Sequence, residues 1–232
     1  MQRTVQPELL DSLPPGAPAA MHNRRDLRLL NAIVGNHRWI ARTLPPLLRP
    51  GERVLELGAG VGDLASRLAR HGLTMDALDL WPVPSGWPES RQWHRSDLRT
   101  FSGYPRYSAF VGNLIFHQFH DGELAQLGAA LRPSARLIVA CEPARRPVAR
   151  RCFRLIAPLF GAHPITLHDA DVSIVAGFVG DELPRALGLT APDWSVNCSI
   201  SLLGLYRMVA IRAPQRNAAG EPGVPAPATH PT

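Results

Sequence analysis

One stretch decides the fold: Val54-Leu55-Glu56-Leu57-Gly58-Ala59-Gly60-Val61-Gly62-Asp63-Leu64. Its apolar residues at 54, 55 and 57 predict a short strand, its alternate glycines predict a tight turn, and a helical pattern follows over 64–69. Glycine adopts positive φ and, because it lacks Cβ, lets a ligand lie against bare backbone. The N-terminus of the following helix presents unpaired N–H groups to that ligand. The stretch therefore predicts a nucleotide-binding corner between a strand and a helix.

The spacing of the glycines narrows the kind of nucleotide. The dinucleotide fingerprint is Gly-x-Gly-x-x-Gly, whereas here Asp63 takes the place of its last glycine. A carboxylate at that place would repel a pyrophosphate, and Glu56 adds a second acidic group just before the turn. An acidic rim suits a cationic ligand better than a dianionic one. A nicotinamide- or flavin-binding domain is the less favoured alternative.

The run from Glu56 to Leu64 resembles motif I of class I S-adenosylmethionine (SAM)-dependent methyltransferases, whose cofactor carries a sulfonium and an ammonium. The resemblance covers roughly residues 50–212 and is to the small-molecule group of the ubiquinone/menaquinone type. It implies an α/β fold, a Rossmann-like three-layer sandwich whose seven-stranded sheet is mostly parallel with an antiparallel last strand. It also implies SAM as cofactor, no metal, and these cofactor-binding residues in the corner: Glu56, Gly58, Ala59, Gly60 and Gly62.

Acidic and amide side chains follow the later strands, where the family places further cofactor contacts. Asp79 ends an expected strand over 73–80 and, as the family's motif II, is expected to accept both ribose hydroxyls, with Leu80 beside it. Asp97 and Leu98 resemble a family motif whose carboxylate takes the adenine amino group and whose next backbone N–H donates to the ring. A helix N-cap is the alternative role for Asp97. Asn113, near the end of the strand over 109–114, is expected in the wall between cofactor and acceptor.

A histidine near the carboxyl ends of the central strands is the best general base for a hydroxyl acceptor. His117 follows the strand over 109–114, and His120 is expected to share its face. Glu142 ends an apolar strand over 136–141 and is expected either to accept a hydrogen bond from substrate or to cap a turn. We therefore take His117 as the first catalytic candidate, with His120 and Glu142 as substrate-binding candidates.

A second catalytic candidate lies in an insertion over 144–178. His168 stands beside Asp169, whose carboxylate would raise the basicity of the imidazole and which is the third substrate-binding candidate. Both belong to a predicted polar loop over 166–170 that would return over the pocket, followed by an apolar segment over 172–178. The insertion begins with a basic amphipathic helix. Its arginines are expected to form a solvated face, with an acidic partner, an anionic substrate or a peripheral membrane contact as alternatives.

The remaining sequence predicts three parts. Residues 1–48 form an N-terminal helical extension with two helices separated at Gly35, which the resemblance implies to be a lid, and packing on the sheet edge is the alternative. Residues 49–213 form the SAM-binding domain, which closes with a hairpin over 194–200 and 205–211. Residues 214–232, rich in Pro, Ala and Gly, are expected to be disordered.

Composition excludes several classes of protein. No run of eighteen apolar residues occurs, no signal-peptide pattern opens the chain, and the three cysteines form no C-x-x-C, so we expect a cytoplasmic protein without a disulfide framework or a zinc site. The net charge is +6, yet all 25 basic residues are arginine. We interpret this as compositional bias, and because the arginines are dispersed we expect no nucleic-acid partner.

The acceptor is expected to be a small hydrophobic molecule, aromatic or polyketide-like, methylated on oxygen or carbon. Motifs for methylation of DNA adenine, of glutamine side chains and of cytosine C5 are absent. Aromatic residues suit such an acceptor, with ordinary core packing as the alternative: Trp39, Phe116, Phe119, Phe153, Phe160 and Phe178. An RNA or protein methyltransferase and a methyltransferase-like binding protein without turnover are the other functional hypotheses.

Overall fold

The computed structural model describes residues 1–10, 13, 22, 25, 31, 33–156 and 163–214, and a central sheet organises them. The strand order is β3-β2-β1-β4-β5-β7-β6. The strands are β1 Val54–Leu57, β2 Asp76–Asp79, β3 Trp93–Arg95, β4 Ala109–Asn113, β5 Leu137–Pro143, β6 Trp194–Ile200 and β7 Leu205–Arg212. Strands β1 to β5 pair in parallel, and β7 is antiparallel to both its neighbours. The predicted seven-stranded, mostly parallel sheet with an antiparallel last strand is confirmed.

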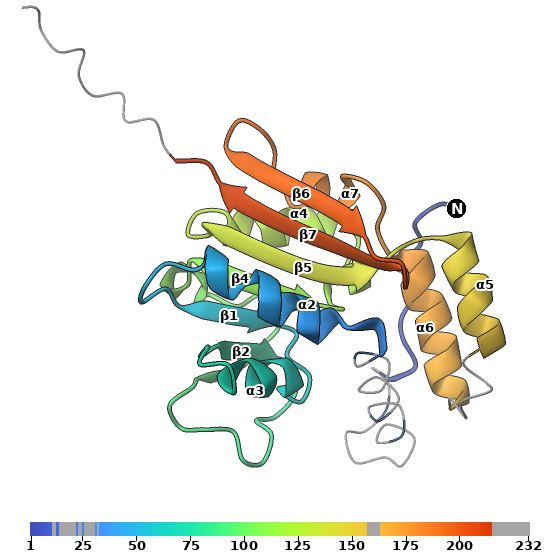
Figure 1. Ribbon diagram of the computed structural model, residues 1–232, viewed down its shortest axis with the longest axis horizontal. Helices are drawn as coiled ribbons and strands as arrows, with labels where there is room; N and C mark the ends of the chain where they lie inside the picture. Colours follow the sequence, from blue (N-terminus) through green and yellow to red (C-terminus); the bar gives the residue numbers. More distant parts are fainter. Residues whose placement is uncertain are drawn as a thin grey trace, which may run out of the picture.

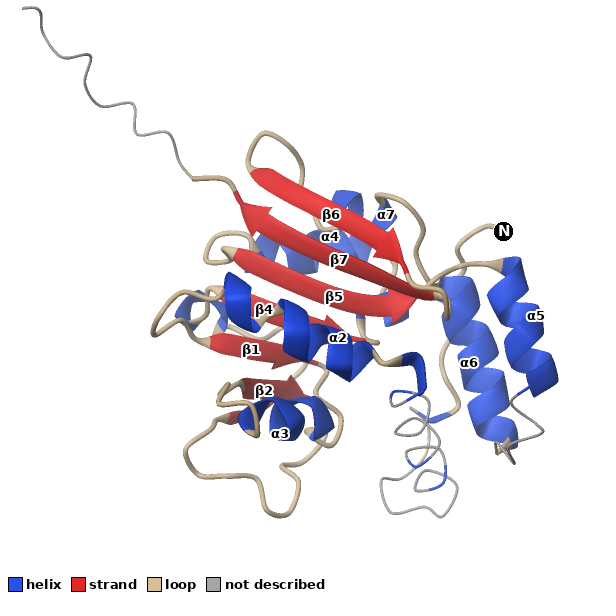
Figure 2. Cartoon of the chain, viewed as in Figure 1, coloured by secondary structure: helices blue, strands red, loops and turns tan. Residues whose placement is uncertain are grey.

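Helices cover both faces of the sheet and make three layers (Figure 1). The α-helices are α2 Asn36–Thr43, α3 Asp63–Ala69, α4 Asp121–Leu131, α5 Pro147–Ile156, α6 Pro164–Ala176 and α7 Glu182–Ala186. Short 3-10 helices are η2 Pro45–Leu47, η3 Tyr104–Arg106 and η4 Phe116–Gln118. One core cluster joins α2 and α3 to the sheet, and the other lies on the side of α4 and α7. Helices α5 and α6 stand beyond the end of β5, apart from both layers (Figure 2).

The central strands are buried along their length, which explains their apolar sequences. Every residue of β1, β2 and β5 is buried, as parallel strands covered on both faces require. The carboxyl ends of β1, β2 and β4 therefore meet at one edge of a rigid sheet. Polar residues at these ends are held by the fold rather than by loops, and the candidate site forms there.

The predicted loop over 166–170 is wrong, because these residues belong to α6. His163 is the N-cap and accepts a hydrogen bond from the backbone N–H of Ile165 (3.3 Å), and Pro164 occupies the first turn, where proline is favoured. The buried face of the helix recurs at three- and four-residue steps: Thr166, Asp169, Val172 and Ala176. Two of these four are polar, so the hydrophobic pattern alone does not predict the helix.

The N-terminal region meets the domain in two places. Helix α2 starts after Gly35, whose left-handed backbone (φ 72°) makes the break expected there, and buries Ile40 and Leu44 against the sheet. Residues 1–10 run in an irregular conformation beside α6 (Figure 1). Most of the expected first helix, including Leu27 and Leu30, lies outside the described residues, as do Phe160 and the tail from 215 to 232.

Candidate active site

A cavity of about 610 Å³ lies at the carboxyl ends of β1, β2 and β4. It is lined by eleven residues that the sequence had singled out: Glu56, Gly58, Ala59, Gly60, Asp79, Leu80, Asp97, Leu98, Asn113, His117 and Asp169. Four others do not line it: Gly62, His120, Glu142 and His168. The strand ends therefore bring most of the predicted residues to one place.

The glycine turn leaves open space for a ligand at one position. Gly58 and Gly60 both have positive φ (67° and 60°), and a Cβ built on Gly60 would meet nothing within 4 Å. A Cβ on Gly62 would lie 2.6 Å from the ring of Trp87. Gly62, at the N-cap of α3, therefore has no room for a side chain because of Trp87, and its contact with a cofactor stays a prediction.

A paired substitution is expected to separate the ligand-facing role of Gly60 from simple backbone strain. Gly60→Ala and Gly51→Ala impose the same positive-φ strain, because Gly51 (φ 75°) also has nothing within 4 Å of a built Cβ. Only the Gly60 variant puts a methyl group into the cavity. We expect similar losses of thermal stability but a drop in S-adenosylhomocysteine (SAH) affinity of about tenfold or more for Gly60→Ala alone, measured by calorimetry. Equal SAH affinities would contradict this assignment.

Asp79 is held in place by the glycine turn. Its Oδ2 accepts a hydrogen bond from the backbone N–H of Gly60 (2.7 Å), and its Oδ1 accepts one from Trp81 (2.9 Å). Burial raises the pKa of this carboxyl, although these backbone N–H groups oppose the rise. Each carboxylate oxygen has a second acceptor direction. Asp79 therefore has the capacity to accept two further hydrogen bonds from a ligand in the cavity.

Glu56 is a buried acid with an unmet hydrogen-bonding atom. Its Oε2 has no hydrogen-bond partner within the described part of the chain. Burial raises the pKa of Glu56 to about 8, against the lowering effect of the Ala65 backbone N–H, and the negative charges of Asp79 and Asp63 add to the rise. An orphaned buried oxygen beside a cavity is costly unless a ligand supplies a donor. Glu56 is thus suited to a cationic N–H group.

Asp97 caps a turn over 98–100 rather than a helix, which was the alternative role expected for it. Its Oδ1 accepts the backbone N–H of Arg99 (2.8 Å), which is the turn-capping geometry of an Asx residue. The Arg99 guanidinium also binds both carboxylate oxygens and reaches Glu123. This guanidinium lowers the pKa of Asp97, against a smaller effect of burial. The carboxylate lines the cavity but is already engaged by Arg99.

Asn113 is fixed by helix α2, which the sequence did not indicate. The Asn36 amide donates to Asn113 Oδ1 (2.6 Å), and the Asn113 amide lies 3.4 Å from His37 Nε2. Burial lowers the pKa of His37, so its imidazole is neutral at pH 7. Because Nε2 faces an amide N–H, the ring proton belongs on Nδ1. His37 lines the cavity beside Asp63 and is a functional candidate that sequence reasoning missed, since nothing in the helical pattern marks it.

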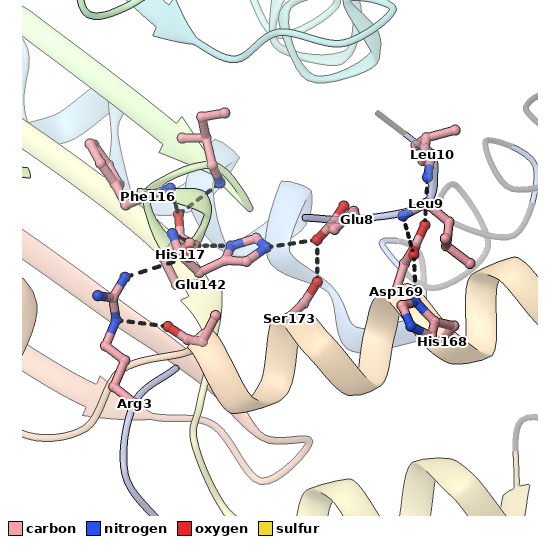
Figure 3. A network of polar contacts seen from close by, with 12 residues as sticks. Arg3, Glu8, Leu9, Leu10, Phe116, His117, Glu142, His168, Asp169 and Ser173 are labelled. Atoms are coloured by element: carbon pink, nitrogen blue, oxygen red, sulfur yellow. Dashed lines mark hydrogen bonds and ion pairs between the residues drawn. The ribbon is translucent and has the colours of Figure 1, made fainter. Parts of the chain in front are cut away.

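His117 lies between two carboxylates (Figure 3). Its Nδ1–H donates to Glu142 Oε2 (2.6 Å) and its Nε2–H donates to Glu8 Oε1 (3.2 Å). Burial lowers the pKa of His117, but the two carboxylates outweigh it and raise the pKa to about 9. The side chain is therefore an imidazolium at neutral pH. In this arrangement it has no nitrogen free to accept a proton, which contradicts the expected general base.

Glu142 is fully buried and belongs to the protein's framework rather than to the cavity wall. Its Oε1 accepts the backbone N–H groups of Ile115 and Phe116 (both 2.9 Å), and its Oε2 accepts the backbone N–H of His117 (3.3 Å) as well as the ring. It thus caps the turn that follows β4, which was the alternative to a substrate contact. Glu142 and His117 form a unit that orients one side of the cavity.

The other predicted histidines do not reach the cavity. His168 lies on α6 next to Asp169, but successive helical side chains point about 100° apart, and the His168 side chain is 48% exposed while that of Asp169 is 8% exposed. Asp169 lies 3.2 Å from His168 Nδ1 through its Oδ1, and it also accepts the backbone N–H groups of Leu9 and Leu10. His120 is exposed and caps α4, together with Glu123. Neither His168 nor His120 is placed to contact an acceptor.

The arginines of the insertion bind within the protein. Arg145 is buried and pairs with Glu182 (2.5 Å), and both Arg150 and Arg154 pair with Asp171 on α6. Over residues 145–154 there are five arginines, and three of them are thus paired with carboxylates of the same chain. These pairs fasten α5 to α6 and α7. They reduce the charge that this surface offers to nucleic acid or to an anionic membrane.

Some of the aromatic residues expected around the acceptor line the cavity, and others belong to the core. Phe119 and Phe153 line the cavity. Phe116 and Phe178 are core residues with exposures of 0% and 1%, and Trp39 packs on the opposite face of the sheet beneath Arg207. The hydrophobic wall is therefore smaller than the sequence suggested.

No protein-family model matches the chain, and no curated protein matches it. Solved structures match it by fold. The plantazolicin methyltransferase BpumL in complex with SAH aligns with a TM-score of 0.67 at 11% identity, over 88% of this chain and 92% of its own. A protein from echinomycin biosynthesis aligns with a TM-score of 0.53 at 20% identity, over 78% and 82% of the two chains. Magnesium protoporphyrin IX methyltransferase ChlM of Synechocystis PCC 6803, with bound SAH, gives 0.50 at 14% identity, over 88% and 91%. At these identities the likeness shows a shared fold.

The described residues also bear on metal binding and on membrane insertion. They contain no group of three or more His, Cys, Asp or Glu side chains arranged to hold a metal ion. None of the helices within them is long and apolar enough to cross a membrane.

Proposed function

We propose that the protein is a SAM-dependent methyltransferase acting on a small hydrophobic acceptor. The observation that carries the proposal is the corner after β1, where Gly60 opens onto the cavity, donates to Asp79, and lies near the orphaned carboxyl oxygen of Glu56. The methyltransferases that share the fold were solved with SAH bound, which supports the same cofactor here. Asp63 stands where the dinucleotide fingerprint has its third glycine and lines the cavity, and a carboxylate there weighs against a pyrophosphate.

The residues around the cavity fit the parts of SAM. Asp79 would accept hydrogen bonds from the two ribose hydroxyls, and Glu56 would accept one from the ammonium. His37 and the amide of Asn113 are the neutral donors nearest to the acidic corner and suit the carboxylate of the methionine moiety. The backbone around Leu98 would meet the adenine. When bound, SAM supplies a methyl group already activated by its sulfonium, so the protein's task is to align the reactants and exclude water.

The other half of the cavity would hold the acceptor. Its walls come from η4, α5, α6 and the turn between β6 and β7, with Phe119, Phe153, Ile174 and Leu203 among them. Apolar walls with few polar groups are typical of sites for small molecules. An oxygen or carbon acceptor fits this half. The internal ion pairs of α5 weigh against the alternative of an RNA methyltransferase.

Two measurements test the proposal directly. Calorimetry should detect binding of SAM and SAH but not of NADH, and radiolabelled SAM should transfer its methyl group to a member of a panel of small hydrophobic acids and phenols. A protein that binds NADH and not SAH would refute the methyltransferase assignment. SAH binding without transfer to any tested small molecule, peptide or RNA would favour the alternative of a binding protein without turnover.

Asp79→Asn is expected to weaken SAH binding by about ten- to a hundredfold, corresponding to roughly 1–3 kcal/mol for lost hydrogen bonds to a charged acceptor. The amide retains the size of the side chain but has only one acceptor oxygen, so it cannot serve both ribose hydroxyls. Calorimetry measures the effect, and Asp171→Asn, which changes a carboxylate between α5 and α6, is the matched control. Equal SAH affinities in the two folded variants would remove Asp79 from the ribose site.

A further inference from the structure

The two carboxylates on His117 differ in how firmly the fold holds them. Glu142 accepts hydrogen bonds from three backbone N–H groups and one ring N–H, so its removal would leave four donors without an acceptor. Glu8 contacts only side chains: His117 Nε2, the hydroxyl of Ser173 in a short hydrogen bond, and Gln118. Glu142 is thus a permanent partner, whereas Glu8 is bound much as a ligand carboxylate would be bound.

Glu8 belongs to a segment, residues 1–10, that is tied down on either side of it. Arg3 donates to the backbone oxygens of Ala176 (2.9 Å) and Phe119 (2.7 Å), pairs with Asp121, and lies over the Phe178 ring. Beyond Glu8, the backbone N–H groups of Leu9 and Leu10 donate to Asp169 (Figure 3). The segment that carries Glu8 is therefore anchored independently of the side-chain contacts of Glu8.

Glu8 also lies in the half of the cavity assigned to the acceptor. Glu8, His117 and Ser173 all line it, together with Phe153 and Ile174. The site therefore offers two donors, an imidazolium N–H and a hydroxyl, at the border of an apolar space. Other charged groups around His117 are already paired: Arg3 with Asp121, and Asp169 with the backbone of Leu9 and Leu10.

We infer that the His117 imidazolium, with the Ser173 hydroxyl, is a carboxylate-binding point in the acceptor half, and that Glu8 is the resident carboxylate which an acceptor's carboxylate replaces. This inference rests on the proposed function, because only a methyltransferase has a methyl acceptor. It names the class of that acceptor: an apolar molecule that carries a carboxylate. Exchange of one carboxylate for another conserves both hydrogen bonds and the charge of the buried site. A neutral group in place of Glu8 would leave the site short of one negative charge beside a buried cation.

The test compares the binding of benzoate to Glu8→Ala and to the wild type, with benzamide as the neutral counterpart of the probe. The variant is expected to bind benzoate about tenfold or more tightly than the wild type, because the competing carboxylate is gone. In ring-labelled histidine NMR spectra, the titration midpoint of His117 should fall in Glu8→Ala and rise again with saturating benzoate, but not with benzamide. Asp171→Ala, which removes another carboxylate contacting α6, should bind benzoate as the wild type does.

The isosteric Glu8→Gln variant keeps the test valid where alanine impairs folding, and should also bind benzoate more tightly than the wild type. Benzoate affinity equal to the wild type in a folded Glu8 variant, or equal binding of benzamide, would overturn the inference. SAH calorimetry on the same samples separates the two proposals. Benzoate binding without SAH binding refutes the methyltransferase and leaves the carboxylate site standing, whereas SAH binding without a benzoate response refutes only the carboxylate site.

Discussion

Glu142→Ala is expected to lower the free energy of unfolding by about 3–5 kcal/mol, which is the loss typical of breaking a buried charge pair. The substitution leaves the His117 imidazolium without its shorter carboxylate contact and leaves three backbone N–H groups of the turn after β4 without an acceptor. Because Glu142 has no exposed surface, water cannot replace it without entering the core. The turn that carries His117 should therefore lose its conformation.

Urea denaturation followed by circular dichroism measures this loss. Asp171→Ala is the control, since its partners Arg150 and Arg154 have side chains 31% and 58% exposed, and such ion pairs contribute about 1 kcal/mol or less. Glu142→Gln should fall between the two, because the amide oxygen accepts the N–H groups that the methyl group cannot. A free energy of unfolding for Glu142→Ala within about 1 kcal/mol of the control would show that the turn is held by packing alone.

The sequence predicted which residues come together at the strand ends of the cavity, because strand order and strand ends can be recognised in it. Gly58, Asp79 and Asn113 each follow a buried apolar run, and in a parallel sheet such positions must meet at one edge. The packing of Gly62 could not be predicted: its spacing fits a ligand-binding turn, and the bulky Trp87 that packs against it comes from a distant loop. Spacing alone cannot distinguish a glycine that faces a ligand from one that faces an indole ring.

The contacts of His117 on the side of α6 could not be predicted, because they join residues far apart in the chain. Glu8 and His117 are separated by 109 positions, and no periodicity marks residues 1–10. The choice between His117 and His168 also needed the structure. A loop over 166–170 would have placed His168 over the pocket. In the helix α6, the Asp169 side chain is buried and the His168 side chain is exposed. The base expected from strand position lies instead between two carboxylates, which raise its pKa to about 9.

The affinity for SAH is expected to rise by up to about tenfold per pH unit from about pH 6 to about pH 8 and then level off, and Glu56 is the reason. Its pKa of about 8 in the free protein means that the carboxyl is protonated at neutral pH. A ligand ammonium beside it favours the ionised form, so binding below pH 8 must release a proton. Calorimetry in two buffers of different ionisation enthalpy counts that proton.

Glu56→Gln is the matched variant, because glutamine keeps the size and an acceptor oxygen but cannot titrate. Its SAH affinity should not show the rise between about pH 6 and pH 8, and no proton should be released. A wild-type affinity that is flat over this range, or a variant that keeps the rise, would show that Glu56 does not meet the ligand ammonium.

In the protein without ligand, ionisation of Glu56 is expected to lower the free energy of unfolding as the pH rises. The folded pKa of Glu56 lies above its usual value, so the folded state binds more protons than the unfolded state between about pH 4.5 and pH 8. The contribution of Glu56 to stability is therefore fully present below about pH 4.5 and is lost as the pH rises to 8. Glu56→Gln should remove this loss and be more stable than the wild type near pH 8. Stability and SAH affinity would then move in opposite directions with pH in the wild type, because the charge that destabilises the empty corner is the one that binds the cofactor's cation.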